Sequence, residues 1–423
     1  IMESIISAEL RDYLLHHNLI TPQQHGFIKR HSTLTNLLES TNDWTLSLSK
    51  HKSVDICYID FQKAFDSLSH PKLVQKLSAY GISGNLLAWI SAFLLNRTQC
   101  VKVGSVISSS CSVSSGVPQG SVLGPLLFIL YINDITDGFD SSVITQIFAD
   151  DLKVYSEISA FSPSANLQDK LNIIHAWSLT WQLTISLTKC HILHLGSSPI
   201  LSNYSISSCP ISFSDQVKDL GIFVDRDLKF STHINSTVAK AKQRGSLIFR
   251  SFISHDIQQL IRAFKVYVRP MVEYASPIWS PSYITQVSLI ESVQRSFTKR
   301  LPGCSELSYY DRLSKLGLPS LEHRRLLIDL QTCYNIIHKN YCIDPLKFFT
   351  FSSNPSARGH SLRLTYPIAK TNSKKFFFST RVVPVWNSLP ENIVLSRTIT
   401  SFKRSLSSID FSKYLIFPSP FDT

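Results

Sequence analysis

The spacing of apolar residues along the chain predicts helices and strands in irregular alternation. Residues 54–60 form a short β-rich run with apolar side chains on one parity, so we expect a strand that carries Asp60 at its end. Residues 69–80 then place apolar positions at helical spacing, and Gly81 ends this predicted helix. A second helix is expected over residues 86–94.

The middle of the chain predicts two hairpins and a buried helix. Residues 99–104 and 111–114 are expected to pair around a run of serines. Residues 116–120 form a glycine-containing loop that leads into a buried helix over residues 126–132. Residues 144–155 are apolar on both sides of a pair of aspartates, which predicts a tight hairpin with two carboxylates at its tip.

The pattern changes again towards the C-terminus. Residues 167–174 mark a helix, and residues 183–187 alternate like a strand that leads into Lys189. Beyond about His233 the predicted helices carry many basic residues, which indicates a second domain. The irregular order of elements favours an α+β fold over a regular βαβ array.

Composition favours a polyanionic partner. Lys and Arg outnumber Asp and Glu by 42 to 30, which gives a net charge of +12. A basic soluble enzyme without such a partner remains the alternative. With 423 residues, 43% of them hydrophobic, the chain is long enough for two or three folded domains.

Cysteine spacing and hydropathy bear on the compartment. The eight cysteines form no CxxC pairs, so we expect a reduced, intracellular protein. The longest apolar run, residues 122–132, is too short for a bilayer and is interrupted by Gly124 and Pro125, so no membrane association is expected. The chain starts at Ile1 inside a predicted helix, and we expect it to be a fragment that begins within a domain.

Asp60, Asp150 and Asp151 come from two predicted strands and are flanked by apolar sequence. Together they would repel one another unless divalent cations compensated the charge. Two Mg²⁺ ions about 4 Å apart on shared carboxylates are a common arrangement for phosphoryl transfer. Taken singly, the aspartate pair also fits a polar turn, and Asp60 also fits a residue that caps the following helix.

Several motifs resemble those of reverse transcriptases from non-LTR (LINE-like) retrotransposons. The palm motifs of that family are similar, in order and separation, to YIDFQKAFD at 58–66, GVPQGSVLGP at 116–125 and FADD at 148–151. The fingers motif and the primer grip are similar to QHGF at 24–27 and VKDLG at 217–221. The resemblance continues into the tail through YYDRL at 309–313 and WNSLP at 386–390. It covers nearly the whole chain, and the three palm motifs together are specific.

The resemblance implies a catalytic role for each acidic position. Asp60 and Asp150 are expected to hold two Mg²⁺ ions, with Mn²⁺ as a possible substitute, and Asp151 is expected to contribute less directly. The backbone at Phe61 is expected to contact a metal ion or the phosphates. Lys189 is a candidate to protonate or neutralise the leaving pyrophosphate, and an exposed strand-end lysine is the alternative.

The resemblance also implies a nucleotide site. Phe65 matches a bulky ring under the incoming sugar, which would select deoxynucleotides; an ordinary core phenylalanine is the alternative. Gln119 and Gly120 are expected against the nascent base pair, because glycine permits close approach of the backbone.

The fingers motif departs from the family. Relatives usually have an arginine immediately before the Ser32-Thr33 pair, where this chain has His31. Lys29 or Arg30 is therefore the expected contact to the triphosphate. An eroded nucleotide site is the alternative.

Nucleic-acid contacts are expected from the primer grip and from the basic helices. The primer-grip and thumb positions are Val217, Lys218, Leu220, Gly221, Lys240 and Arg244. The pairs Arg324-Arg325 and Lys374-Lys375 either contact template phosphates or belong to solvated helix faces.

The expected architecture is a right-hand polymerase with an antiparallel palm sheet. Residues 1–50 are expected to form partial fingers, 51–231 the palm with interleaved fingers elements, 232–300 a helical thumb, and 301–423 a basic, mostly helical C-terminal domain. Full-length relatives also carry an endonuclease that nicks target DNA to make the primer.

The expected activity is RNA-directed DNA polymerisation, with an RNA template, a DNA primer or target, and dNTPs as partners. Action at genomic DNA implies work in the nucleus. One alternative is a catalytically inactive retrotransposon remnant that only binds nucleic acid. A second is an RNA-dependent RNA polymerase, which Phe65 disfavours. The sequence does not indicate an oligomeric state.

Overall fold

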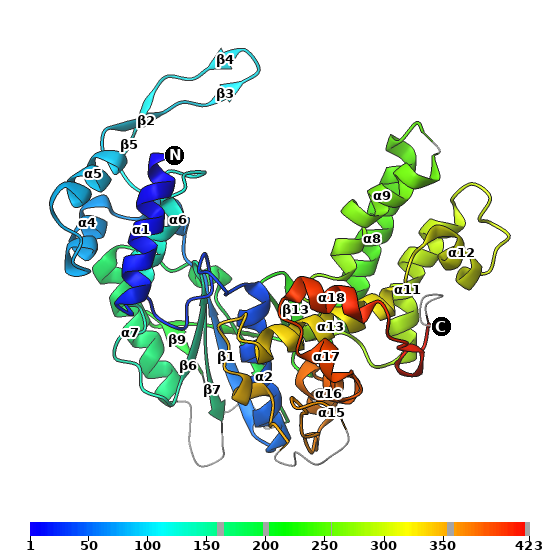
Figure 1. The fold of residues 1–423 in the computed structure, drawn as a ribbon. Coiled ribbons are helices and arrows are strands. Elements are labelled where there is room, and N and C mark those ends of the chain that lie inside the picture. The colour runs from blue at the N-terminus through cyan, green and yellow to red at the C-terminus, as the bar shows by residue number, and fades with distance from the viewer. Residues whose placement is uncertain (159–164, 198–202, 255, 353–358, 419–423) are drawn as a thin grey trace. The chain divides into compact units, whose positions relative to one another are not determined.

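The chain folds into two compact units. The computed structural model describes residues 1–158, 165–197, 203–254, 256–352 and 359–418 (Figure 1). The first unit comprises residues 1–36 and 52–215, and the second comprises 37–51 and 216–423. Both contain helices and strands, which confirms the predicted α+β class. The division into fingers, palm, thumb and C-terminal domain remains a prediction.

The first unit is built on a five-stranded sheet of order β11-β8-β1-β7-β6. Its three central pairings are antiparallel, and only β11 joins in parallel, which agrees with the expected palm sheet. The strands are β1 (Ser53–Ile59), β6 (Ile144–Phe148), β7 (Asp151–Ile158), β8 (His191–Leu195) and β11 (Ser212–Ser214). A short hairpin is formed by β9 (Ser205–Ile206) and β10 (Cys209–Pro210).

Helices pack on this sheet through a hydrophobic core. Its members include Leu14, Leu77, Ile90, Leu130 and Leu171, together with sheet residues such as Ile59 and Ile147. The helices are α1 (Met2–His16), α3 (Ala64–Ser67), α4 (His70–Ala79), α5 (Gly84–Leu94), α6 (Gly124–Ile132) and α7 (Ala165–Trp181). All nine residues of α6 except Pro125 are buried, which confirms the predicted buried helix.

The hairpin after α5 differs from its prediction. β2 (Arg97–Gln99) does pair with β5 (Cys111–Val113), but β3 (Lys102–Val103) and β4 (Val106–Ile107) form a second ladder beyond them. The chain therefore turns at Gly104, which has φ +61°, and not at the serine run. Glycine adopts that backbone conformation more readily than any other residue.

The predicted strand over residues 183–187 is wrong. Ile185 makes one isolated bridge, to Phe61, and residues Leu187–Lys189 form the 3₁₀ turn η1. Leu183 and Ile185 are nonetheless buried, because this segment packs into the core beside the end of β1. Their alternation reflected burial of one side of an irregular segment.

The second unit is mostly helical. It begins with most of α2 (Thr33–Ser49) and resumes at the hairpin β12 (Gln216–Asp219) and β13 (Ile222–Asp225). The longer helices are α8 (Ser231–Ser251), α9 (Ile257–Tyr267), α11 (Ile284–Lys299), α12 (Tyr309–Leu316), α13 (Leu321–Ile337), α16 (Phe378–Asn387) and α18 (Ile399–Leu406). Shorter turns are η2 (Arg269–Val272), α10 (Ser276–Trp279), α14 (Pro345–Phe348), α15 (Asn372–Lys375), α17 (Glu391–Val394) and η3 (Ser412–Tyr414).

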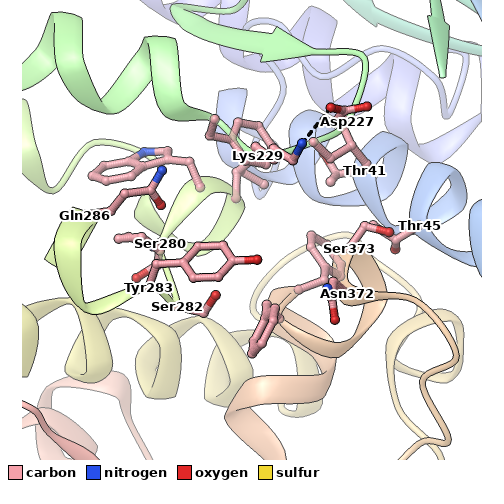
Figure 2. A pocket seen from close by; sticks show the side chains of 17 residues that line it. Thr41, Thr45, Asp227, Lys229, Ser280, Ser282, Tyr283, Gln286, Asn372 and Ser373 are labelled. Carbon is pink, nitrogen blue, oxygen red and sulfur yellow. Dashed lines mark hydrogen bonds and ion pairs between the residues drawn. The ribbon is translucent and has the colours of Figure 1, made fainter. Parts of the chain in front are cut away.

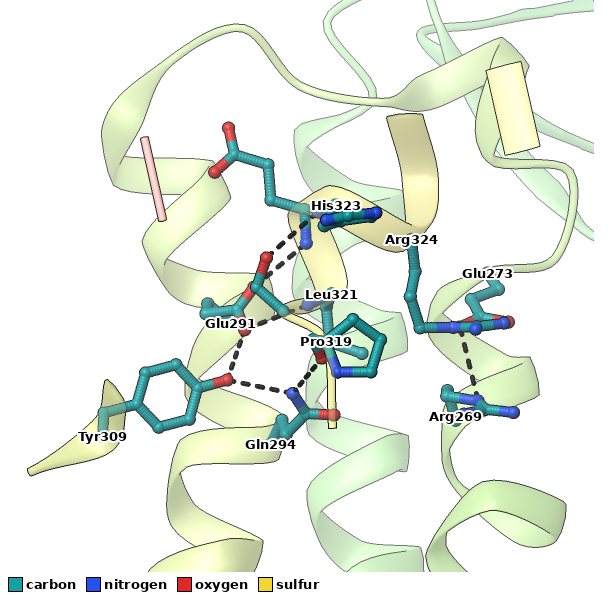
Figure 3. A network of polar contacts seen from close by, with 11 residues as sticks. Arg269, Glu273, Glu291, Gln294, Tyr309, Pro319, Leu321, His323 and Arg324 are labelled. Atoms are coloured by element: carbon teal, nitrogen blue, oxygen red, sulfur yellow. Dashed lines mark hydrogen bonds and ion pairs between the residues drawn. The ribbon is translucent and has the colours of Figure 1, made fainter. Parts of the chain in front are cut away.

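Buried ionic contacts hold these helices together. Glu291 of α11 is fully buried and accepts hydrogen bonds from the N–H groups of Leu321 (3.0 Å) and Glu322 (3.2 Å) and from the Tyr309 hydroxyl (Figure 3). It thus satisfies backbone donors at the start of α13. Nearby, Arg381 of α16 makes a two-pronged ion pair with Asp329 of α13.

The length and apolarity of the described helices bear on whether any of them could span a membrane. Within the part of the chain that the structure covers, none combines the length and apolarity needed to cross a bilayer.

Candidate active site

Asp60 and Asp150 lie at the same end of two neighbouring strands in the first unit's sheet. Asp60 directly follows β1, and its carbonyl accepts a hydrogen bond from Ser186 N–H at 2.7 Å. Asp150 occupies the two-residue turn between β6 and β7, where Ala149 has φ +57°. Since β1 pairs with β7 up to Ile59 and Leu152, the turn lies beside the end of β1. Both aspartates are half-buried, whereas Asp151 is exposed.

The two carboxylates influence each other electrostatically. The pKa of Asp150 is raised, first by burial and also by the negative charge of Asp60, while Lys189 lowers it. The Lys189 ammonium lies 3.2 Å from Asp60 Oδ1. The structure therefore brings together Asp60, Asp150 and Lys189, which are far apart in sequence.

The donors at this point suit a hard divalent cation. The carboxylates of Asp60 and Asp150 provide anionic oxygen ligands. The carbonyl of Phe61 accepts no hydrogen bond from any residue that the structure describes, so it is available as a further ligand. No group of three or more His, Cys, Asp or Glu side chains arranged for a metal ion occurs among the described residues.

The glycine-containing loop is tied to the segment after Asp60. The Gln119 amide donates to Asp66 Oδ1 at 2.7 Å, and Val117 N–H donates to the Phe65 carbonyl at 2.9 Å. A Cβ on Gly116, which has φ +81°, would lie 2.6 Å from the Asp66 carbonyl oxygen. Glycine is thus required for the close approach. Gly120 has open space around it, as a surface for a substrate requires.

Phe65 packs against two other aromatic rings. Its ring stacks on the buried ring of Phe128 with centroids 4.1 Å apart and meets Phe27 edge-on at 6.3 Å. The side chain is only partly buried, so part of it remains accessible.

The QHGF segment anchors the turn that carries Asp150. The side-chain oxygen of Gln24 accepts hydrogen bonds from Gly26 N–H (2.7 Å) and Ala149 N–H (2.9 Å). His25 N–H also donates to the Ile147 carbonyl at 2.8 Å. A Cβ on Gly26 would lie 2.4 Å from the Ala149 nitrogen, so no other residue fits there.

The basic residues of the fingers motif lie beside this anchor. Lys29 and Arg30 are exposed, and Arg30 adopts φ +69°. The His31 ring meets the His25 ring edge-on at 4.6 Å. The two basic side chains are therefore accessible to an anion, and His31 packs against the motif.

The expected nucleic-acid contacts belong to the second unit. Lys218 lies exposed on β12, and Val217 is buried beneath the hairpin. At its tip, Leu220 and Gly221 have φ +42° and +91°, and the Tyr274 hydroxyl donates to the Leu220 carbonyl at 2.8 Å. Lys240 and Arg244 are exposed one turn apart on α8.

Two basic positions of the tail are not surface contacts. Arg325 is 2% exposed and Lys374 is 6% exposed. Lys374 donates to Asn42 Oδ1 and Ser379 Oγ, and burial lowers its pKa to about 8. Arg324 pairs with Glu273 (Figure 3). Both predictions for Arg325 and Lys374, a contact to template phosphates and a place on a solvated helix face, were thus wrong. Tertiary packing buries the two side chains.

Sequence reasoning did not assign a role to Gln24, Gly26 or Asp66. All three lie inside the quoted motifs, so the motifs did contain the signal. Their partners, Ala149 and Gln119, are distant in sequence, and only the fold reveals the hydrogen bonds.

Comparison with known proteins identifies a family. The family described as "Reverse transcriptase (RNA-dependent DNA polymerase)" matches residues 1–224. Among curated proteins, an RNA-directed DNA polymerase from mobile element jockey of Drosophila funebris is 27% identical over 66% of this chain and 32% of its own length. A probable RNA-directed DNA polymerase from transposon BS of Drosophila melanogaster is 26% identical over 73% of this chain and 35% of its own. The chain thus spans about a third of these relatives.

Among solved structures, telomerase from Candida albicans, determined with a fragment of telomeric RNA, aligns with a TM-score of 0.41 and 12% identity. The alignment covers 72% of this chain and 56% of that one.

Proposed function

Because the chain belongs to the reverse transcriptase (RNA-dependent DNA polymerase) family, we propose that it is the polymerase part of a non-LTR retrotransposon protein. It adds dNTPs to the 3′-hydroxyl of a DNA primer on an RNA template. The observation that carries the proposal is the meeting of Asp60 and Asp150 beside Lys189 at the end of one sheet.

Asp60 and Asp150 would hold the metal ions, with the Phe61 carbonyl and Asp151 as further oxygen ligands. Two Mg²⁺ ions, or Mn²⁺ in their place, would lower the pKa of the primer hydroxyl and neutralise the triphosphate. Lys189 compensates the charge of Asp60 and would neutralise or protonate the leaving pyrophosphate.

The incoming nucleotide is proposed to lie over Phe65. The accessible part of this side chain would clash with a 2′-hydroxyl, which favours dNTPs over ribonucleotides. The side-chain N–H₂ group of Gln119 donates a hydrogen bond to Asp66. The side-chain carbonyl oxygen of Gln119 would therefore accept a hydrogen bond from the substrate. Gly120 leaves room for the nascent base pair, and Lys29 and Arg30 would contact the triphosphate.

Template and primer are proposed to contact the second unit through phosphates. Lys218 with the backbone of Val217, Leu220 and Gly221 would grip the primer, and Lys240 and Arg244 would contact the duplex. Such contacts depend strongly on salt and read no sequence. Action at a genomic DNA primer would take place in the nucleus.

Primer extension tests the proposal. Purified protein, an RNA template with an annealed DNA primer, Mg²⁺ and dNTPs should give extension that Asp150→Ala abolishes. The inactive-remnant alternative predicts that wild type binds the same duplex without extending it. Extension with ribonucleotides alone would instead support an RNA polymerase.

A further inference from the structure

The second unit contains a pocket that the proposed catalysis does not use. It has a volume of about 130 Å³ and is lined by segments of α2, the β13–α8 connection, the α10–α11 region and α15 (Figure 2). Pockets for drug-sized ligands measure roughly 300–1,000 Å³. This pocket therefore has room for one ring system and not for a whole nucleotide.

Aromatic rings form much of the wall. Tyr283 and Phe376 lie with ring centroids 6.3 Å apart at 54°, and Trp279 and Phe377 add further apolar surface. Tyr283 is 54% exposed, so its ring is accessible from solvent. Exposed ring faces beside a small cavity offer stacking to a planar ligand.

Uncharged polar groups in this pocket lack partners. Thr41 is 1% exposed, and its hydroxyl makes no hydrogen bond. The side chains of Tyr283 and Asn372 also form none with any described residue, and Figure 2 shows the Tyr283 hydroxyl directed across the pocket. A buried hydroxyl without a partner is costly unless a ligand or water satisfies it.

Charge lies at the edge of the pocket. The Lys229 ammonium forms an ion pair with Asp227 at 2.8 Å, so the charges of these two lining residues cancel (Figure 2). Lys375 is exposed, and its ammonium lies 5.4 Å from the centroid of the Phe376 ring. A phosphate outside the pocket would thus meet a cation, while a ring inside would meet neutral groups.

We propose that this pocket binds one unpaired nucleobase of a single-stranded nucleic acid. The base stacks on Tyr283 and Phe376, and its polar edge meets Thr41 and Asn372. The flanking phosphate contacts Lys375. Aromatic stacking next to a basic residue is the usual way to bind single strands without reading their sequence. The proposal does not depend on catalysis by the first unit.

Fluorescence anisotropy with labelled eight-nucleotide single strands tests the proposal. Three probes are compared: RNA, DNA and an abasic ribose-phosphate strand of the same length. Tyr283→Ala and Phe376→Ala should each weaken binding of the base-containing strands by about tenfold, the usual effect of one lost stack. Neither change should alter binding of the abasic strand.

Tyr310→Ala is the matched control, because Tyr310 is a similarly exposed tyrosine (47%) of the same unit outside the pocket. It should bind all strands like wild type. Asp150→Asn should also bind normally, so a failed polymerase proposal leaves this test intact. Thr41→Val, which keeps the shape and removes the hydroxyl, should weaken binding without unfolding. Equal affinity of wild type for base-containing and abasic strands, or no effect of Tyr283→Ala on either, would overturn the proposal.

Discussion

Lys189 and Asp60, 129 residues apart, form an ion pair at 3.2 Å. The same lysine lowers the pKa of Asp150, which burial and Asp60 raise. Without this cation, the Asp150 carboxyl would hold its proton more tightly. Lys189 thus influences both carboxylates that we propose to bind metal ions.

Lys189→Ala should therefore move the acid limb of the rate–pH profile to higher pH, because Asp150 must lose its proton to bind a cation. Turnover should also fall by about 10²-fold or more through loss of an acid catalyst. Single-turnover primer extension between pH 5 and 9 measures both effects. Lys189→Arg, which keeps the positive charge, should leave the acid limb at the same pH as in wild type. Lys52→Ala, which removes an ion pair with Glu157 at the other end of β1, should leave the profile unchanged.

Asp150→Asn should abolish extension, by at least about 10³-fold, yet stabilise the metal-free fold at neutral pH. The folded-state pKa of Asp150 is raised, so the fold favours the protonated form, and stability falls as pH rises through that pKa. Asparagine mimics the protonated form. Thermal unfolding in EDTA should show the variant above wild type at pH 7.5 and equal to it well below pH 4. Asp151→Asn, at an exposed position, should raise the unfolding temperature above that of wild type by a smaller amount.

Phe65→Val should admit ribonucleotides. Discrimination against them should fall by about 10- to 100-fold, because the ring no longer blocks a 2′-hydroxyl. The lost stack on Phe128 should also cost about 1–3 kcal/mol of unfolding free energy. Competition between dNTP and rNTP measures the first effect. Phe93→Val is the control for the second, since Phe93 packs partly buried on the same core and should alter stability without altering discrimination.

Gln24→Met should loosen the turn that carries Asp150. The N–H groups of Gly26 and Ala149 lose their acceptor, which should cost about 1–3 kcal/mol and lower turnover. Hydrogen exchange at the Ala149 amide should accelerate. Gln23→Met changes the neighbouring side chain without removing either bond and serves as the control. Unchanged exchange at Ala149 in the Gln24 variant would contradict the anchoring role.

Tyr309→Phe should destabilise the second unit in a pH-dependent way. The Tyr309 hydroxyl stabilises the charged form of buried Glu291, whose pKa burial raises (Figure 3). The loss, about 1–3 kcal/mol, should appear where Glu291 is ionised and shrink as falling pH protonates it. Urea unfolding at several pH values measures this dependence. Tyr310→Phe should show none, and a loss independent of pH would contradict the assignment.

The sequence by itself determined which groups are the candidates for the proposed chemistry. The evidence for them is local: the strand period around Asp60, the apolar flanks of Asp150-Asp151 and the glycines of the intervening loop. Patterns formed by residues close in sequence can be recognised without the structure. For the same reason the helices over 70–79 and 124–132 and the hairpin at 144–158 were predictable.

Only the tertiary structure decided how these groups are held and which charges are solvated. The hydrogen bonds of Gln24 to Ala149 and of Gln119 to Asp66 join segments 125 and 53 residues apart. Arg325 and Lys374 look like surface residues in sequence and are buried by helices that meet them in space. The physical reason is that burial and desolvation depend on neighbours distant along the chain, which no local spacing encodes.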